Sequence, residues 1–125
     1  MKKKTVYIAG PVTNDPDYKW KFARAQSKLE RRGYKVVNPV SLAAALPDTF
    51  TWKQIMEVCL AALSQVDEAY FLEGWEASTG ATIEFESIRG RIPVKYEKPK
   101  PRTESFHIEI PEFLKNFGKD REDEG

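Results

Sequence analysis

Four short apolar runs recur along the chain, and each is separated from the next by a segment with helical or polar spacing. The runs are short enough to be single strands, at Thr5–Ala9, Tyr34–Val37, Ala69–Leu72 and Ile92–Tyr96. Strands that alternate with helices pair in parallel, and their crossover helices cover the faces of the sheet. The pattern therefore predicts an α/β fold: a small parallel sheet flanked by helices, Rossmann-like or flavodoxin-like.

The first helix has the clearest sequence signals. Gly10-Pro11 ends the first strand and opens a polar loop, and Asp15-Pro16 then predicts an N-cap followed by proline at the first helical position. Apolar residues follow at helical spacing, at Tyr18, Phe22, Ala25 and Leu29. Gly33 indicates the stop, so the first strand, this helix and the next strand form a βαβ unit with a right-handed crossover.

The remaining helices are predicted from caps and breakers. Asn38-Pro39 closes the second strand, and Ser41–Leu46 predicts a short helical turn that Pro47 stops. Thr51–Gln54 fits a capping box and begins a helix that ends near Gln65. Its apolar face comprises Trp52, Ile55, Met56, Cys59, Leu60 and Leu63. Ser78 predicts the N-cap of a last helix that runs to about Gly90, and Pro93 indicates that the fourth strand is an edge strand or begins irregularly.

The composition changes after Glu97, so residues 1–97 are expected to form one domain. The segment 98–125 is expected to hold a proline-rich linker, a short strand at 106–110, a short helix at 111–117 and a charged tail. The tail, residues 119–125, has no apolar anchor and is predicted to be dispensable.

Composition excludes several classes of function. The formal net charge of +1 favours neither a nucleic-acid nor a membrane partner, and the basic clusters at Lys2–Lys4 and Lys98–Arg102 are interpreted as solubilising. No apolar run is long enough to span a membrane, and no signal peptide is recognisable. Cys59 is the single cysteine and His107 the single histidine. These counts exclude an intramolecular disulfide, are typical of a reducing cytoplasm, and lead us to expect no metal and no cofactor.

The stretch Asp67–Glu86 carries the chemistry that stands out. A buried strand leads through a polar loop to the helix that Ser78 begins, an arrangement that α/β proteins use to bind anions and nucleotides. At about 100° per residue, Glu84 lies beside Ile88 and Ala81 at the border of the apolar face. A carboxylate there is a candidate nucleophile or base, although a Glu in a helix is more often solvated and a Ser at its start is more often only a cap.

Two motifs resemble one superfamily. Tyr7-Ile-Ala-Gly-Pro11 and Ser78-Thr-Gly-Ala-Thr-Ile-Glu84 are similar to the signatures of nucleoside 2-deoxyribosyltransferases and 2'-deoxynucleoside 5'-monophosphate N-glycosidases. The resemblance covers residues 4–96 and is closest to a phage- and prophage-borne family of unknown function within that superfamily, which also carries Gly74-Trp75-Glu76.

The resemblance implies that Glu84 attacks the anomeric carbon of a (deoxy)ribosyl group while the base departs. Tyr7 would hold the glutamate or contact the sugar. Ala9, Gly10, Pro11 and Gly80 would lie along the ligand, and Ser78 would bind its 5'-phosphate or 5'-hydroxyl. Trp75 would stack on the base or shape the pocket, unless it is an ordinary core anchor.

One position departs from the superfamily pattern. The characterised enzymes place an acid eight residues before the aspartate that opens the third strand, and Cys59 holds that position relative to Asp67. Glu57 lies on another helical face, whereas Glu76 is a candidate replacement if its loop folds inward.

Three functions therefore remain open. The first is an N-glycosidase or deoxyribosyltransferase that acts on a nucleoside or nucleotide. The second is a non-catalytic nucleotide-binding module with the same pocket. The third, a flavodoxin-like or receiver-type domain, fits the fold but expects acidic residues where Gly10-Pro11 stands. We also expect a homodimer or a dimer of dimers, because the helix that begins near Thr51 is apolar on more surface than a four-strand sheet covers.

Overall fold

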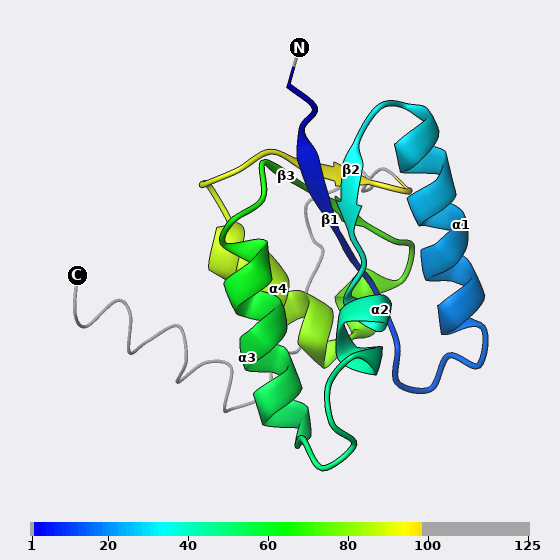
Figure 1. The fold of residues 1–125 in the computed structure, drawn as a ribbon, viewed down its shortest axis with the longest axis vertical. Helices are drawn as coiled ribbons and strands as arrows, with labels where there is room; N and C mark the ends of the chain where they lie inside the picture. Colours follow the sequence, from blue (N-terminus) through cyan, green and yellow to red (C-terminus); the bar gives the residue numbers. More distant parts are fainter. Residues whose placement is uncertain (1, 99–125) are drawn as a thin grey trace, which may run out of the picture.

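The computed structural model describes residues 2–98, which fold around a four-stranded parallel sheet with the order β2-β1-β3-β4 (Figure 1). The strands are β1 (Thr5–Ala9), β2 (Lys35–Val37), β3 (Glu68–Phe71) and β4 (Val94–Tyr96). The predicted fold class, a small parallel sheet flanked by helices, is confirmed. The expected linker, strand, helix and tail after Lys98 lie outside the described residues.

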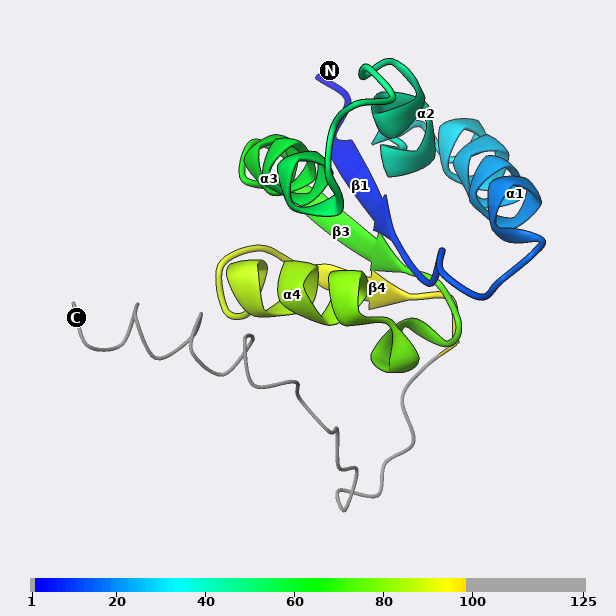
Figure 2. The ribbon, with the colours of Figure 1, turned by 90° about the horizontal axis from the view of Figure 1, so that it is seen from below.

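The two faces of the sheet carry separate apolar cores, because successive side chains of a strand point to opposite faces. Val6 and Ile8 of β1 pack with Phe22, Ala25 and Leu29 of α1 (Tyr18–Arg31). On the other face, Tyr7 and Ala9 pack with residues of α3 (Trp52–Leu63) and α4 (Thr79–Ile88). Figure 2 shows α1 on one side of the sheet and both of these helices on the other.

The order in which successive strands join the sheet reverses between β1 and β3. β1 leads to α1 and β2 on one side, and β3 leads to α4 and β4 on the other side. The loops after β1 and β3 therefore diverge at the carboxyl ends of the two central strands. In open α/β sheets, this crevice is the usual place for a ligand.

The first helix starts later than its sequence predicts. The Asp15 side chain accepts a hydrogen bond from the Asp17 backbone N–H at 2.9 Å and pairs with Lys21, so Asp15 forms a turn before the helix. The N-cap is Asp17, and the helix begins at Tyr18 rather than at Pro16. The predicted N-cap at Asp15 was thus wrong by two residues, because its carboxylate has nearer partners than the helix amides.

The helix after β2 starts earlier than predicted. It is α2 (Pro39–Ala44), with the Asn38 side chain accepting from the Val40 backbone N–H at 2.9 Å and proline at the first helical position. Asn38-Pro39 therefore both closes the strand and begins the helix. The capping box of α3 is confirmed, since Thr51 and Gln54 each bond the backbone N–H of the other.

β4 is an edge strand, as predicted, but it begins at Val94 rather than at Ile92, since Pro93 cannot donate a ladder hydrogen bond. The loop between β3 and α4 contains a short 3₁₀ helix at Trp75–Ala77. Within residues 2–98, none of the helices has the length and apolarity needed to cross a membrane.

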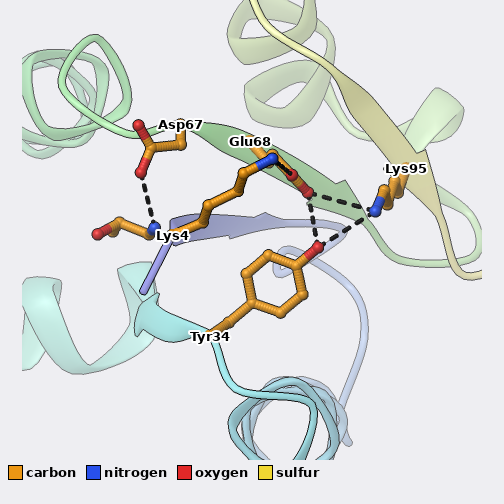
Figure 3. A network of polar contacts seen from close by, with 6 residues as sticks. Lys4, Tyr34, Asp67, Glu68 and Lys95 are labelled. Atoms are coloured by element: carbon orange, nitrogen blue, oxygen red, sulfur yellow. Dashed lines mark hydrogen bonds and ion pairs between the residues drawn. The ribbon is translucent and has the colours of Figure 1, made fainter. Parts of the chain in front are cut away.

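The amino ends of the strands are joined by a buried carboxylate (Figure 3). Glu68 of β3 is 4% exposed and accepts a hydrogen bond from the Tyr34 hydroxyl at 2.8 Å. Lys4 and Lys95 form ion pairs with it at 3.3 and 3.5 Å. Burial by itself raises the pKa of Glu68, but Tyr34 and the two lysines outweigh it and hold that pKa below its usual value. Because Lys4 and Tyr34 immediately precede β1 and β2 and Lys95 lies within β4, one side chain of β3 links all four strands.

Candidate functional site

A cavity of about 440 Å³ opens at the carboxyl ends of β1 and β3. Its walls come from the loop after β1, from the first turns of α1 and α4, and from α2 and α3. The lining residues are Gly10, Val12, Thr13, Tyr18, Lys19, Phe22, Pro39, Val40, Ala43, Ala44, Trp52, Ile55, Met56, Cys59, Ser78, Gly80, Ala81 and Glu84. The cavity therefore occupies the crevice where the loops of the two central strands diverge.

Glu84 brings a carboxylate into this cavity from α4. Its side chain is 6% exposed, and its Oε2 accepts a hydrogen bond from the Tyr7 hydroxyl at 2.5 Å. The alternation of β1 turns Tyr7 toward the face that α4 covers, and Tyr7 itself is fully buried. The two residues that the sequence motifs single out are thus in contact, although 77 positions separate them along the chain.

Burial sets the protonation of this pair. Removal from water raises the pKa of Glu84 to about 7, and the hydrogen bond from Tyr7 opposes that rise. Burial and the neighbouring Glu84 charge raise the pKa of the Tyr7 phenol well above its ordinary value. Tyr7 therefore stays protonated and donates its hydrogen bond, while Glu84 exchanges its proton near neutral pH. A carboxyl group with such a pKa suits nucleophilic or acid–base chemistry.

Cys59 of α3 lies beside the same pair. Its thiol is 4% exposed and interacts with both the Tyr7 hydroxyl and the Glu84 carboxylate. Burial is the largest cause of the raised pKa of this thiol, so it remains protonated at neutral pH. The position where the resemblance expects an acid thus reaches the floor of the cavity, but it brings a weakly acidic thiol.

The amino end of α4 forms a second side of the cavity. Ser78 caps the helix by accepting a hydrogen bond from the Ala81 backbone N–H at 3.2 Å, and the hydroxyl retains a proton to donate. A Cβ at Gly80 would lie 3.4 Å from the Met56 sulfur, so a side chain there would fill space between α4 and α3. Glycine at this position keeps the cavity open.

Gly10 has a packing role in addition to the close ligand approach that the resemblance implies. A Cβ at Gly10 would lie 2.9 Å from the Leu72 Cβ, closer than packed side chains allow. The glycine is therefore required where the end of β1 packs on the end of β3. Gly10 also lines the cavity, so both roles are compatible with its position.

Four other residues predicted for the site lie away from the cavity walls. Ala9 is fully buried in the core, and Pro11 lies beside Gly74, 3.6 Å from where a Cβ on that glycine would be. Trp75 is 3% exposed and packs against the aromatic rings of Phe71, Phe85 and Tyr96, the position of a core anchor. Glu76 lies near Tyr96, whose pKa is raised mainly by burial and further by the Glu76 charge.

Several lining residues were missed from the sequence. Thr13 and Lys19 belong to the loop and helix after β1, and no motif singles them out. Trp52, Ile55 and Met56 were recognised as part of an apolar helix face, and Trp52 and Met56, with Leu60, were expected to need a partner subunit to cover them. The structure places Trp52, Ile55 and Met56 along the cavity. Whether this helix face forms a subunit interface or a cavity wall depends on how α2 and α3 pack, which the sequence pattern of one helix does not determine.

Within residues 2–98, no group of three or more His, Cys, Asp or Glu side chains is arranged to hold a metal ion. No curated protein and no solved structure matches the chain. One protein family does match, over residues 4–96, and this span contains every strand and helix described above. The chain therefore belongs to the family described as a domain of unknown function, DUF4406.

Proposed function

We propose that this protein cleaves or transfers the N-glycosidic bond of a (deoxy)nucleoside or nucleoside 5'-monophosphate, with Glu84 as the nucleophile. The observation that carries the proposal is the buried Tyr7–Glu84 pair beside a cavity of about 440 Å³. A carboxylate buried at this cost is uncommon without a functional or ion-pairing reason, and its partner here is a neutral phenol. The similarity of both motifs to the deoxyribosyltransferase superfamily supports the same conclusion.

The reaction follows the logic of a retaining glycosidase. A carboxylate oxygen of Glu84 bonds to the anomeric carbon as the bond from that carbon to the base nitrogen breaks, and the base leaves with the bonding electrons. The resulting ester is then opened by water, which gives hydrolysis, or by a second base, which gives transfer. Tyr7 orients the carboxylate through its hydrogen bond. The amino end of α4, with Ser78, supports an assignment of the sugar's 5' substituent to that side.

A nucleotide-binding module that lacks turnover is the second candidate, and one observation favours it. Glu84 is the only carboxylate among the described residues that line the cavity, and Cys59 offers only a protonated thiol of raised pKa. A departing base gains from a proton, and a general acid typically contributes about 10²–10⁴-fold in rate. A site without such an acid would bind the nucleotide and release the base slowly.

Base release from a panel of nucleosides and nucleoside 5'-monophosphates, followed by chromatography, tests the proposal. The unmodified protein should release free base from at least one of them. Glu84→Gln should abolish release, because the loss of a nucleophile costs several orders of magnitude in rate. Glu86→Gln is the matched control, since Glu86 lies on the same helix, is partly exposed and pairs with Arg89.

The outcomes separate the two candidates. Release that persists in Glu84→Gln excludes Glu84 as the nucleophile. Binding of a nucleotide without release by the unmodified protein favours the binding module. A Glu86→Gln variant that loses release as fully as Glu84→Gln would show that charge on α4, rather than attack by Glu84, is responsible.

A further inference from the structure

The cavity has two chemically different sides. Seven residues of α2 and α3 line one side of the cavity, and we call them the apolar wall: Pro39, Val40, Ala43, Ala44, Trp52, Ile55 and Met56. Their one polar side-chain group is the indole N–H of Trp52, and Cys59 of α3 adds a thiol at the inner end of the wall. The facing side, from the β1 loop, α1 and α4, contributes the polar side chains of Thr13, Tyr18, Lys19, Ser78 and Glu84. A ligand that fits both sides has a flat apolar part and a polar or anionic part.

The α3 residues of the apolar wall connect the cavity mouth to Glu84. Trp52, Ile55 or Met56, and Cys59 recur at helical spacing, and the seven steps from Trp52 to Cys59 rise about 10 Å along the helix axis. Trp52 is 50% exposed, whereas Cys59 is 4% exposed and lies beside the Tyr7–Glu84 pair. A sugar placed against Glu84 would thus direct its base along this stripe, toward the Trp52 ring.

The start of α3 fixes where the Trp52 backbone lies. Thr51 accepts a hydrogen bond from the Gln54 backbone N–H at 3.1 Å, and Gln54 accepts one from the Thr51 backbone N–H at 2.8 Å. Trp52 is the first residue inside this capping box. The capping box fixes the backbone from which the Trp52 ring projects, so a base that stacks on the ring orders only the side chain and not the start of the helix.

We propose that the apolar wall holds the aromatic base of the ligand, with Trp52 stacking on its face, and that it accepts purines and pyrimidines alike because no side chain of the wall reads the base edge. The inference rests on the proposed function for the placement of the sugar at Glu84. It adds to that function a residue that distinguishes ligands with a base from ligands without one, and it assigns the site a broad base range.

The magnitude of discrimination follows from the chemistry of the wall. A hydrophobic pocket separates related ligands by roughly 10–200-fold, whereas a site built to hydrogen-bond a ligand group rejects the analogue lacking it by about 10⁴-fold or more. Affinities for the different bases should therefore fall within about 100-fold of one another.

Equilibrium binding of five probes provides the test: the 5'-monophosphates of deoxyadenosine, deoxyguanosine, deoxycytidine and thymidine, and 2-deoxyribose 5-phosphate. Binding is measured by calorimetry in a Glu84→Gln background, so that the nucleotides stay intact. Trp52→Ala should weaken each nucleotide by about 5–100-fold and leave the sugar phosphate unchanged, because only the nucleotides have a base to stack. Trp52→Phe should retain most of the affinity.

Trp20→Ala is the matched control. Trp20 is 60% exposed, stacks with Arg24 and is not among the residues that line the cavity. It should bind all five probes as the background protein does. Melting temperatures of the Trp52 and Trp20 variants establish that each is folded.

Two results overturn the inference: nucleotide affinity that is unchanged in Trp52→Ala, or one base that binds more than about 100-fold tighter than every other. Failure of the proposed function is separately visible. If nucleotide binding depends on Trp52 but the unmodified protein releases no base, the proposed catalytic function is wrong and the base-binding role of the apolar wall stands. If the protein releases base with a KM that Trp52→Ala does not change, the base-binding role of the apolar wall is wrong and the proposed catalytic function stands. If no probe binds, the inference about the apolar wall is wrong, and the base-release panel alone decides on the proposed function.

Discussion

Glu84 is a single carboxyl group whose protonation links the chemistry of the site to pH. Its pKa of about 7 results from burial, with the Tyr7 hydrogen bond opposing the rise. The attacking form is the carboxylate, so kcat/KM for base release should increase as the pH rises through about 7. Tyr7→Phe removes the bond that lowers the pKa, and the rising limb should move to higher pH with a reduced plateau. A pH–rate profile of both proteins checks this, and a limb that stays in place in Tyr7→Phe would contradict it.

The same carboxyl group also affects folding. Its folded-state pKa is raised from 4.5 to about 7, so the folded protein binds this proton more tightly than the unfolded chain does. Stability from Glu84 is therefore full below pH 4.5 and is lost as the pH rises to about 7. The maximum loss is roughly 3 kcal/mol, since one pKa unit corresponds to about 1.4 kcal/mol.

Glu84→Gln should remove this dependence, because the amide does not titrate. The variant should gain stability relative to the unmodified protein as the pH increases from about 5 to about 8. Urea unfolding at these two pH values measures the difference, and Glu86→Gln should show none of it. A Glu84→Gln variant that is less stable at the higher pH would mean that the carboxylate is better solvated than its burial indicates.

Helix starts show which parts of an element a local pattern determines. The capping box of α3 is predicted correctly, because both of its hydrogen bonds form within four residues. Asp15 has the same kind of N-cap pattern, yet its carboxylate bonds the Asp17 amide and Lys21 and leaves the cap two residues later. The position of an N-cap is thus predictable where no other donor competes for the capping side chain, and it shifts where one does.

The four strands depend on Glu68 at the end of the sheet opposite the cavity. Tyr34 bonds this carboxylate, and Lys4 and Lys95 pair with it from largely exposed positions. Glu68→Ala should lower the free energy of unfolding by about 1–3 kcal/mol, mostly through the lost Tyr34 bond, since exposed ion pairs contribute little. The pKa of Glu68 is lowered in the fold, so this contribution is present at neutral pH and is lost as the pH falls.

Urea unfolding of Glu68→Ala at neutral and acidic pH measures both parts of that prediction. Nucleotide binding at the cavity should be retained, because the link lies at the amino ends of the strands. An unchanged unfolding free energy at neutral pH would show that β1 and β3 hold the sheet together without it.

For the molecule as a whole, the sequence predicts the sheet, and the strand ends at which the site lies, better than it predicts the shape of the cavity. The strand alternation that buries Tyr7 and the cap at Ser78 are local, and both are visible before folding. The placement of Trp52 and Met56 along the cavity depends on how α2 and α3 pack, which no local pattern encodes. Trp75 is the opposite case from Trp52. It was predicted for the site from its place beside the motif, but its side chain packs in the aromatic core.

The oligomeric state is the last prediction, and it concerns how the molecule covers its apolar surface. Among residues 2–98, the exposed large apolar side chains are Val12, Trp20 and Trp52, with 41%, 60% and 50% of their surface accessible. Val12 and Trp52 both lie at the cavity, so a second copy packed on this rim would cover them and restrict solvent access to Glu84. A stable interface buries at least about 1,000 Å² in total, which this rim reaches only with neighbouring helix surface.

We therefore expect a homodimer, or a dimer of such dimers, in solution. Sedimentation equilibrium at micromolar concentration determines the mass directly. Replacement of Val12 by Asp should shift a rim dimer toward monomer, because a charge at a packed apolar contact is costly to desolvate. Trp20→Asp is the control for a surface outside the cavity. A monomer at every concentration would contradict the prediction, and a dimer that responds to Trp20→Asp alone would place the interface on α1.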